Sequence, residues 1–257
     1  MDCTKQFLLG LFTSAIMVVL PSISCAKEIA VPEQHKTIQA ALDAASTGDI
    51  ILVDPGTYHE RLVLKRGITL KSAGDDTQGK LGLLRAEKTI INGGGKQGEG
   101  PGVELAEKAV LDGFTITNVG FYDDAKWKKH HATQGNLQSY EHIGAPGVAG
   151  IAITGISTCT VINNIVHHIG YTGIAITGNP SKQVSPRVIR NFSYRNMGGG
   201  IGSMKKSTAF ISENTCFENF YAGIGHDDAS PLVTKNICYS NIRAGIGISE
   251  NACPIVR

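Results

Sequence analysis

The sequence predicts an all-β chain wound into a parallel solenoid, because two features recur with one period. A Gly-Ile pair returns five times, at intervals of 23, 27, 23 and 22 residues, as Gly150-Ile151, Gly173-Ile174, Gly200-Ile201, Gly223-Ile224 and Gly245-Ile246. An asparagine stands nine residues before each of the last four pairs, at Asn164, Asn191, Asn214 and Asn236. A period in the twenties built from short strands is typical of solenoids, whose repeats bury their apolar faces only against neighbouring repeats.

Each repeat contains three short apolar runs. The first follows the glycine, as in Ile174-Ala175-Ile176, the second centres on residues such as Val188, and the third follows the asparagine. These runs alternate with period two and are rich in β-branched residues, which predicts strands. The glycines and asparagines between them leave no room for helices.

Parallel stacking at about 4.8 Å places equivalent residues of successive coils above one another. The four asparagines then form an interior ladder, in which each amide pairs with the backbone and with the next asparagine. A second column follows five residues later, at Asn196, Asn219 and Asn241. First strands begin near residues 62, 103, 151, 174, 201, 224 and 246, which predicts six complete coils and part of a seventh.

The two ends of the solenoid differ. A helix over about 38–45 is expected to cap the front, with Thr37 as its N-cap and with Ile38, Leu42 and Ala45 on its buried face. The regular coils run over 150–257 and stop without a cap. An open parallel edge favours aggregation, so we expect further coils of a longer chain, or a partner, to cover it.

The N-terminal half carries a resemblance to a known group of proteins. The runs concerned are Lys36–Ala45, Gly48–Val53, Pro55–Glu60 and Thr89–Gly93. They resemble the start of right-handed parallel β-helix proteins of the pectin-lyase-like superfamily, including repeat domains similar to the NosD copper-maturation protein. The resemblance covers roughly 29–257 and implies the fold. It leaves the activity open, because this superfamily holds lyases, esterases, epimerases, hydrolases and proteins without catalytic activity.

Residues 1–26 have the features of an export signal, which leaves one domain over 27–257. Lys5 precedes an apolar stretch over 7–20, which is too short to span a bilayer comfortably, and Ser24-Cys25-Ala26 offers small residues before a cut. The expected location is therefore outside the cell or in the periplasm, with no transmembrane segment after cleavage. A lipoprotein anchored through Cys25 is disfavoured by Ser22, and an uncleaved N-terminal anchor is the other alternative.

Charge and cysteine content restrict the functions further. The net charge is +2, charged residues make up 18%, and the basic residues are scattered, so nothing indicates nucleic-acid binding. Cys216 and Cys238 fall in one interior column. Stacked Cβ atoms about 4.8 Å apart exceed the roughly 3.8 Å that a disulfide prefers, so buried free thiols are favoured and a bridge is left open.

One long insertion, over about 120–149, interrupts the period before the third coil, whose first strand begins near residue 151. It contains Tyr122 and Trp127, which is the only tryptophan of the chain, together with the basic residues Lys128 and His130. Long loops on rigid scaffolds commonly bind ligands. We expect the insertion to roof the first-strand face, where the resemblance places the substrate groove of polysaccharide-active β-helix proteins, with Tyr122 and Trp127 contacting substrate.

The first-strand face is predicted to be flat, because its outward residues are Ala152, Ala175, Gly202, Gly225 and Gly247. Polar residues follow it along the chain. The candidate catalytic residues are Lys128 and His130 as acid or base with Asp227 and Asp228 as carboxylates, and the candidate substrate-binding residues include Lys205 and Glu250. Elimination next to a uronate carboxylate needs such a base and a cation, so Ca²⁺ is expected only if the protein is a lyase. The alternative is an ordinary surface charge ladder of Lys205, Asp228 and Glu250, which is favoured.

No metal site is expected. His130-His131 and His167-His168 are adjacent pairs, so on a strand their side chains point to opposite faces. The resemblance to copper-maturation repeats concerns the repeats alone. His226 is interpreted as a histidine at the rim with one satisfied nitrogen.

Outward aromatic residues of the third strands form another column: His167, Tyr194, Phe217 and Tyr239. These rings could bind sugars, but mutual packing is favoured.

Three functions remain open. The first is an exported β-helix that binds or processes polysaccharide on the first-strand face; the second is a lyase, epimerase or hydrolase acting in that groove on uronate polymers; the third is a non-catalytic repeat scaffold. The catalytic signatures of pectin methylesterases, pectate lyases and polygalacturonases do not occur, and Asp227-Asp228 lacks the companions of the last. Fold alone does not decide among the three.

Overall fold

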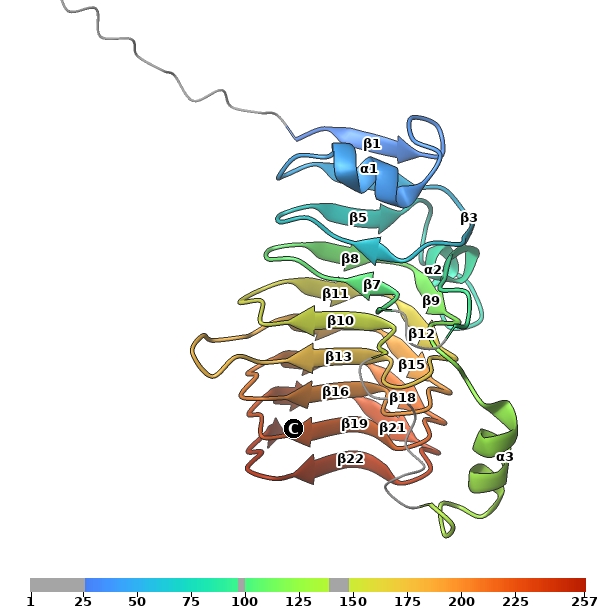
Figure 1. Cartoon of the computed structure of the whole chain (residues 1–257), viewed down its shortest axis with the longest axis vertical. Coiled ribbons are helices and arrows are strands. Elements are labelled where there is room, and N and C mark those ends of the chain that lie inside the picture. The colour runs from blue at the N-terminus through green and yellow to red at the C-terminus, as the bar shows by residue number, and fades with distance from the viewer. Residues whose placement is uncertain (1–25, 97–99, 139–147) are drawn as a thin grey trace, which may run out of the picture.

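The computed structural model describes residues 26–96, 100–138 and 148–257, and it is a solenoid of three parallel sheets (Figure 1). Sheet 1 contains the first strands of the repeats, in the order β4 (Leu62–Val63), β7 (Val103–Glu104), β10 (Ile151–Thr154), β13 (Ile174–Thr177), β16 (Ile201–Met204), β19 (Ala222–Asp227) and β22 (Ala244–Ser249).

Sheet 2 contains the second strands, in the order β1 (Glu28–Val31), β2 (Ile50–Val53), β5 (Thr69–Ser72), β8 (Val110–Asp112), β11 (Thr160–Ile162), β14 (Arg187–Ile189), β17 (Phe210–Ser212), β20 (Leu232–Thr234) and β23 (Ile255–Val256). Sheet 3 contains the third strands, in the order β3 (Gly56–Tyr58), β6 (Thr89–Asn92), β9 (Thr115–Thr117), β12 (Ile165–His167), β15 (Phe192–Tyr194), β18 (Thr215–Phe217) and β21 (Ile237–Tyr239). The described residues form three helices: α1 (Ile38–Ala44), α2 (Leu84–Lys88) and α3 (Asp124–Ala132).

The predicted fold class is confirmed, but the solenoid has more turns than the sequence indicated. The nine strands of sheet 2 mark about nine turns, because β1 and β2 add two strands ahead of the first predicted coil. Between these two strands the chain forms α1 in place of a first strand, so no Gly-Ile pair marks the turn.

Helix α1 closes the front of the solenoid, as predicted. The Thr37 hydroxyl accepts a hydrogen bond from the Ala40 backbone N–H at 3.2 Å. The carboxylate of Glu60 accepts two more, from the N–H groups of Ile38 and Gln39, each at 2.9 Å. Together they satisfy donors that a helix start leaves without partners, and the carboxylate also complements the positive end of the helix dipole.

The predicted asparagine ladder runs through the interior. Asn164, Asn191 and Asn214 are fully buried, and each donates its backbone N–H and its side-chain N–H to the side-chain oxygen of the next asparagine, at 2.9–3.0 Å. The last acceptor is Asn236, which is partly exposed. The second column repeats this pattern from Asn196 to Asn219 to Asn241. These bonds hold successive coils in register.

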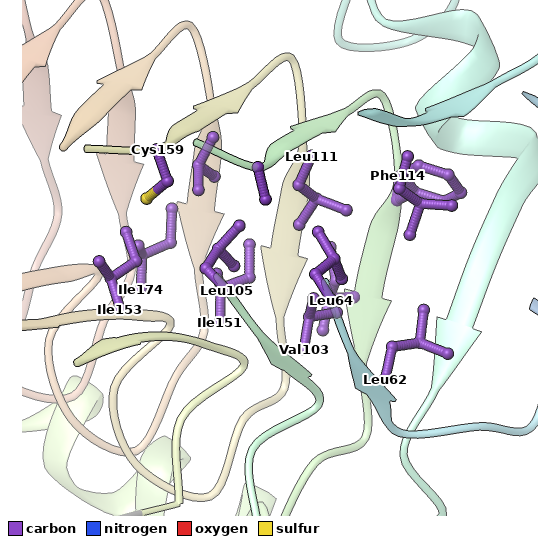
Figure 2. Packing of buried hydrophobic residues seen from close by; sticks show 14 of the residues in the cluster. Leu62, Leu64, Val103, Leu105, Leu111, Phe114, Ile151, Ile153, Cys159 and Ile174 are labelled. Carbon is purple, nitrogen blue, oxygen red and sulfur yellow. The ribbon is translucent and has the colours of Figure 1, made fainter. Parts of the chain in front are cut away.

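Between the sheets lies a narrow apolar core. Figure 2 shows inward side chains of successive coils gathered in this core, including Leu62, Val103 and Ile151, which stand in register on β4, β7 and β10. Burying one such Leu, Ile or Val side chain contributes about 1.5–3 kcal/mol. The thiols of Cys216 and Cys238 share this core and are free. The hydrogen bond between them raises the pKa of Cys216 and lowers that of Cys238.

The last coil exposes residues that earlier coils bury. Ile248 is 57% exposed, whereas its counterpart two coils earlier in the column, Ser203, is buried. Inward-facing Val256 is likewise exposed, although Val233 beside it is buried. The expectation that further coils or a partner cover this edge stays a prediction.

In the part of the chain that the structure describes, no helix combines the length and the apolarity that crossing a bilayer requires. The predicted export signal, 1–26, lies outside the described residues except for Ala26, so it too stays a prediction.

Candidate functional site

The described part of the insertion lies at the corner between sheets 3 and 1, and α3 does not cover sheet 1 (Figure 1). The indole N–H of Trp127 donates to the backbone carbonyl of Glu218 at 2.8 Å. The side-chain amide of Gln138 donates to the carbonyl of Phe220 in the same turn. The expectation that this segment roofs the first-strand face is therefore wrong for residues 120–138; residues 139–147 lie outside the description.

Trp127 is the anchor of α3. Only 3% of it is exposed, because it packs in an apolar cluster with Met197, Phe220 and Ile242. The guanidinium of Arg195 lies 4.2 Å from the centre of the indole, which adds a cation–π contact. A sugar could touch Trp127 only if α3 left the corner.

The other predicted residues of the insertion also contact side chains of the protein itself. Lys128 forms an exposed ion pair with Asp124 at 2.6 Å. His130 is 3% exposed, and its ring meets that of Phe220 edge-on at 5.1 Å. Tyr122 packs edge-on against His168, and burial raises the pKa of its hydroxyl.

The positions of His167 and His168 contradict the prediction that adjacent histidines point to opposite faces. Their Nδ1 atoms lie 2.6 Å apart, so the two side chains do not point to opposite faces. The period-two rule fails here because His168 has a φ of 54°, in the left-handed region, and the strand has already ended. Burial lowers the pKa of both, that of His167 to about 4, so both rings are neutral. Across residues 26–96, 100–138 and 148–257, no three His, Cys, Asp or Glu side chains gather as metal ligands would.

A groove of about 710 Å³ lies on the outer face of sheet 1. Gly202, Gly225 and Gly247 form its floor, on three adjacent strands in register. One wall lies at the corner with sheet 3, and the other lies at the far ends of the strands. The walls are lined by Tyr171, Tyr221 and Arg243 on the corner side and by Met204, Asp227 and Ser249 on the other. Three of the five residues of the predicted flat face thus form the floor of this groove, whereas Ala152 and Ala175 are not among its lining residues.

The structure separates the predicted charged residues. Asp227 lines the groove, whereas Lys205, Asp228 and Glu250 are not among its lining residues. Asp228 forms an ion pair with Lys206, and among the described residues no ion pair joins Lys205, Asp228 and Glu250 to one another. All three ladder residues have φ values of 49–53°, which indicates that they occupy the same tight turn on successive coils. Asp227 is therefore the only one of the four proposed catalytic residues in the groove.

His226 lies inside the solenoid, and its placement at the rim is wrong. It is 2% exposed and stands in register between Ser203 and Ile248. Neither ring nitrogen has a hydrogen-bond partner among the described residues. Burial lowers the pKa of His226 to about 4, so the ring is neutral at pH 7.

The outward aromatic column on sheet 3 packs against itself. The rings of His167, Tyr194, Phe217 and Tyr239 stack at centroid distances of 5.0, 4.6 and 5.0 Å. Each inner ring covers the faces of its neighbours, so those faces are closed to a sugar. The favoured interpretation, mutual packing, agrees with this geometry.

Sequence reasoning missed the corner wall of the groove. Its residues stand two positions before the last four Gly-Ile pairs, where the column reads Tyr171, Gly198, Tyr221 and Arg243. The repeat itself could have revealed this column, because equivalent positions in a solenoid share one side of the molecule.

Comparisons with known proteins agree with the architecture. The family model described as "Right handed beta helix region" matches residues 112–257, more than half of the chain. A search of curated proteins found no match.

Similar solved structures include three enzymes. Pectin methylesterase PemA from Erwinia chrysanthemi has 13% identity and a TM-score of 0.43, over 88% of this chain and 67% of that one. Pectin methylesterase from Yersinia enterocolitica has 13% identity and a TM-score of 0.34, over 78% of this chain and 56% of that one. Pectate lyase Pel9A has 14% identity and a TM-score of 0.37, over 90% and 78%.

The aligned part thus spans little more than half of the Yersinia enzyme. Such low identities and TM-scores carry no information on activity. The family match and the three parallel sheets decide the classification: the chain belongs to the right-handed β-helix region family.

Proposed function

We propose that this protein binds a polysaccharide chain along the groove on sheet 1. The observation that carries the proposal is the glycine floor, because Gly202, Gly225 and Gly247 leave a bed along the solenoid axis without side chains. An extended polymer can lie flat on such a bed and contact several coils. The volume of about 710 Å³ falls within the usual range for ligand sites.

The walls supply the contacts that a sugar polymer needs. Tyr171 and Tyr221 offer ring surface on one side, and Asp227 and Ser249 offer hydrogen-bonding groups on the other. Sugars combine apolar ring faces with hydroxyl groups, so walls of both kinds support the proposal. Arg243 adds a cation that favours acidic sugars. Export through residues 1–26 is part of the proposal, because a secreted or periplasmic protein meets such polymers.

The distribution of charged groups favours binding over cleavage. Elimination from a uronate needs a base beside a cation that holds the carboxylate. Lys128 and His130 lie at the corner, and Asp227 is the only carboxylate among the described residues that line the groove. Ca²⁺ takes 6–8 oxygen ligands, many more than this carboxylate provides.

Titration against immobilised acidic and neutral glycans tests the proposal. Gly225→Leu places a side chain on the floor, and the backbone has room for its Cβ, which would meet only the Ala222 Cβ at 4.0 Å. We expect this variant to raise the Kd at least about tenfold, since it obstructs the bed. Thr234→Leu, the matched control on the outer face of sheet 2, should bind as the natural protein does. Absence of binding to every glycan, or unchanged binding by Gly225→Leu, refutes the proposal.

A parallel assay separates binding from cleavage. The protein is incubated with alginate, pectate and chondroitin, with Ca²⁺ or with a chelator, and the absorbance of unsaturated ends is followed. We expect no increase. An increase that Asp227→Asn abolishes would identify a lyase in the same groove and would contradict the binding-only proposal.

A further inference from the structure

We infer that the insertion braces the corner wall of the groove from outside, and that Trp127 and Gln138 are positioning residues for ligand binding. The inference rests on the proposed function and concerns the same groove. No described residue of the insertion is among those that line the groove, so α3 can act on a ligand there only through the wall. Two wall residues, Tyr221 and Arg243, carry the argument.

Each of these wall residues directly follows a buried apolar residue. Phe220 precedes Tyr221 and is fully buried, whereas Tyr221 is half-buried and lines the groove. In the next coil Ile242 precedes Arg243 and is 8% exposed, whereas Arg243 is exposed and lines the groove. Because one peptide bond joins the two residues of each pair, whatever holds the apolar residue also restrains the wall residue after it.

The insertion covers both apolar residues. Trp127 packs with Phe220, Ile242 and Met197 in one buried cluster. The chain after α3 approaches this cluster so closely that a Cβ at Gly135 would lie 2.6 Å from the carbonyl oxygen of Ile242. A larger residue there would displace the coil, and the φ of 78° at Gly135 also lies in the left-handed region that favours glycine. Helix α3 and the turn after it thus hold the two turns on which the wall is built.

The turn that contains Tyr221 is fixed by two sets of hydrogen-bond donors. The carbonyls of Asn219 and Tyr221 accept from backbone N–H groups of the following coil, at 2.9 and 3.1 Å. The carbonyls of Glu218 and Phe220 accept from the side-chain N–H groups of the two positioning residues. The solenoid therefore holds this turn from one direction and the insertion holds it from another.

The two wall residues form one surface across adjacent coils. The guanidinium of Arg243 lies 5.1 Å from the centre of the Tyr221 ring. A shift of either turn separates the two side chains. A ligand that contacts both binds most tightly when both turns are already held, because it then does not have to order them. Removal of the brace adds this ordering cost to binding.

Coupling between α3 and the groove must act in both directions. If docking of α3 strengthens ligand binding by some factor, the ligand strengthens docking of α3 by the same factor. Such couplings typically amount to about 5–150-fold. A role of α3 in overall stability alone predicts no specific effect of the ligand on α3.

Calorimetric titrations with galacturonate, alginate and cellulose hexasaccharides as probes test the brace. Gln138→Ala removes one donor, and Trp127→Ala removes the other donor together with the cluster contact. Each should raise the Kd of the best probe at least about fivefold. Lys129→Ala, which removes an exposed side chain from α3, is the matched control and should stay within about twofold of the natural protein. Circular dichroism checks folding, and Gln138→Ala leaves Trp127 in place.

Hydrogen exchange of the natural protein tests the reverse direction without any substitution. A saturating concentration of the best probe should slow exchange in α3 at least about fivefold more than in α1, at the far end of the solenoid (Figure 1). Equal slowing in the two helices overturns the inference, because the ligand would then act on global stability alone.

The titrations also separate the inference from the proposed function. If the natural protein binds a probe and either Gln138→Ala or Trp127→Ala binds it equally well, the brace is refuted and the proposed function stands. Lys129→Ala as weak as Gln138→Ala also refutes the brace, because the loss of an exposed side chain would then matter as much as the loss of a brace contact. If the natural protein binds no probe, both are overturned.

Discussion

The asparagine ladder should carry a large share of the stability, and Asn191 is the position that tests this. Its side-chain N–H₂ group donates to the carbonyls of Val161 and Ile189 and to the side-chain oxygen of Asn214, at 3.0, 3.1 and 2.9 Å. Its oxygen accepts from the backbone and side-chain N–H groups of Asn164 at 2.9 and 3.0 Å. One side chain thus takes part in five hydrogen bonds.

Asn191→Ala removes all five at a site that is fully buried. At about 1 kcal/mol net for each bond, the free energy of unfolding should fall by about 5 kcal/mol. The backbone N–H of Asn164 loses its acceptor in the interior, and burying an unpaired amide accounts for much of this loss. Total stabilities of domains lie near 5–15 kcal/mol, so the change should be large enough to unfold part of the solenoid.

Urea unfolding followed by circular dichroism measures the effect, and Asn236→Ala provides the control. Asn236 takes part in four equivalent hydrogen bonds but is partly exposed, so water can replace its side chain. We expect the control to lose about half as much stability. A loss below about 1 kcal/mol for Asn191→Ala, or equal losses at both positions, would refute the reasoning that burial of the ladder determines its contribution.

Three further predictions concern other parts of the molecule. Arg85, 5% exposed, is paired with Asp76 at 2.7 Å and with Asp112, so Arg85→Met should cost about 3–5 kcal/mol by leaving two carboxylates without a cation. A lower Tm in a thermal melt checks this, and an unchanged Tm would contradict it. Trp127→Ala should release α3 from the corner, and hydrogen exchange of residues 218–222 should become faster; unchanged protection would show that α3 is held otherwise. The folded pKa of His226 is about 4, below the unfolded value near 6.5, so its contribution is complete above about pH 6.5 and is lost as pH falls towards 4. The difference between the free energies of unfolding measured by urea titration at pH 7.5 and at pH 4.5 should therefore shrink in His226→Leu, by up to about 3 kcal/mol. An identical pH dependence of the two proteins would show that His226 does not contribute.

The repeating features were predictable because they depend on local periodicity. Asn191 and Gly225 recur at fixed offsets, and stacking alone then places one inside the solenoid and the other on a flat face. The strands β1 and β2 were missed because α1 takes the place of a first strand between them, so the period is absent there.

The insertion could not be placed from the sequence, because its position depends on long-range packing. Nothing near Trp127 in the chain indicates that its indole N–H meets the carbonyl of Glu218. The prediction that the side chains of His167 and His168 point to opposite faces failed for a local reason. His168 is in the left-handed region, which ends the alternation on which the prediction relied. The corner wall of the groove, with Tyr171, Tyr221 and Arg243, was accessible in principle, but only by comparing the same position across several repeats.

The attachment of α3 has a consequence for how the protein is made. Trp127 and Glu218 are 91 residues apart in the chain, and Gln138 and Phe220 are 82 apart. Ribosomes add about 5–20 residues per second, so α3 is synthesised roughly 5–20 seconds before the backbone to which it binds. During that interval the indole lacks the carbonyl of Glu218 and the apolar cluster of Met197, Phe220 and Ile242. Docking of α3 can take place only when the coils after it have wound, which makes it a late step of folding.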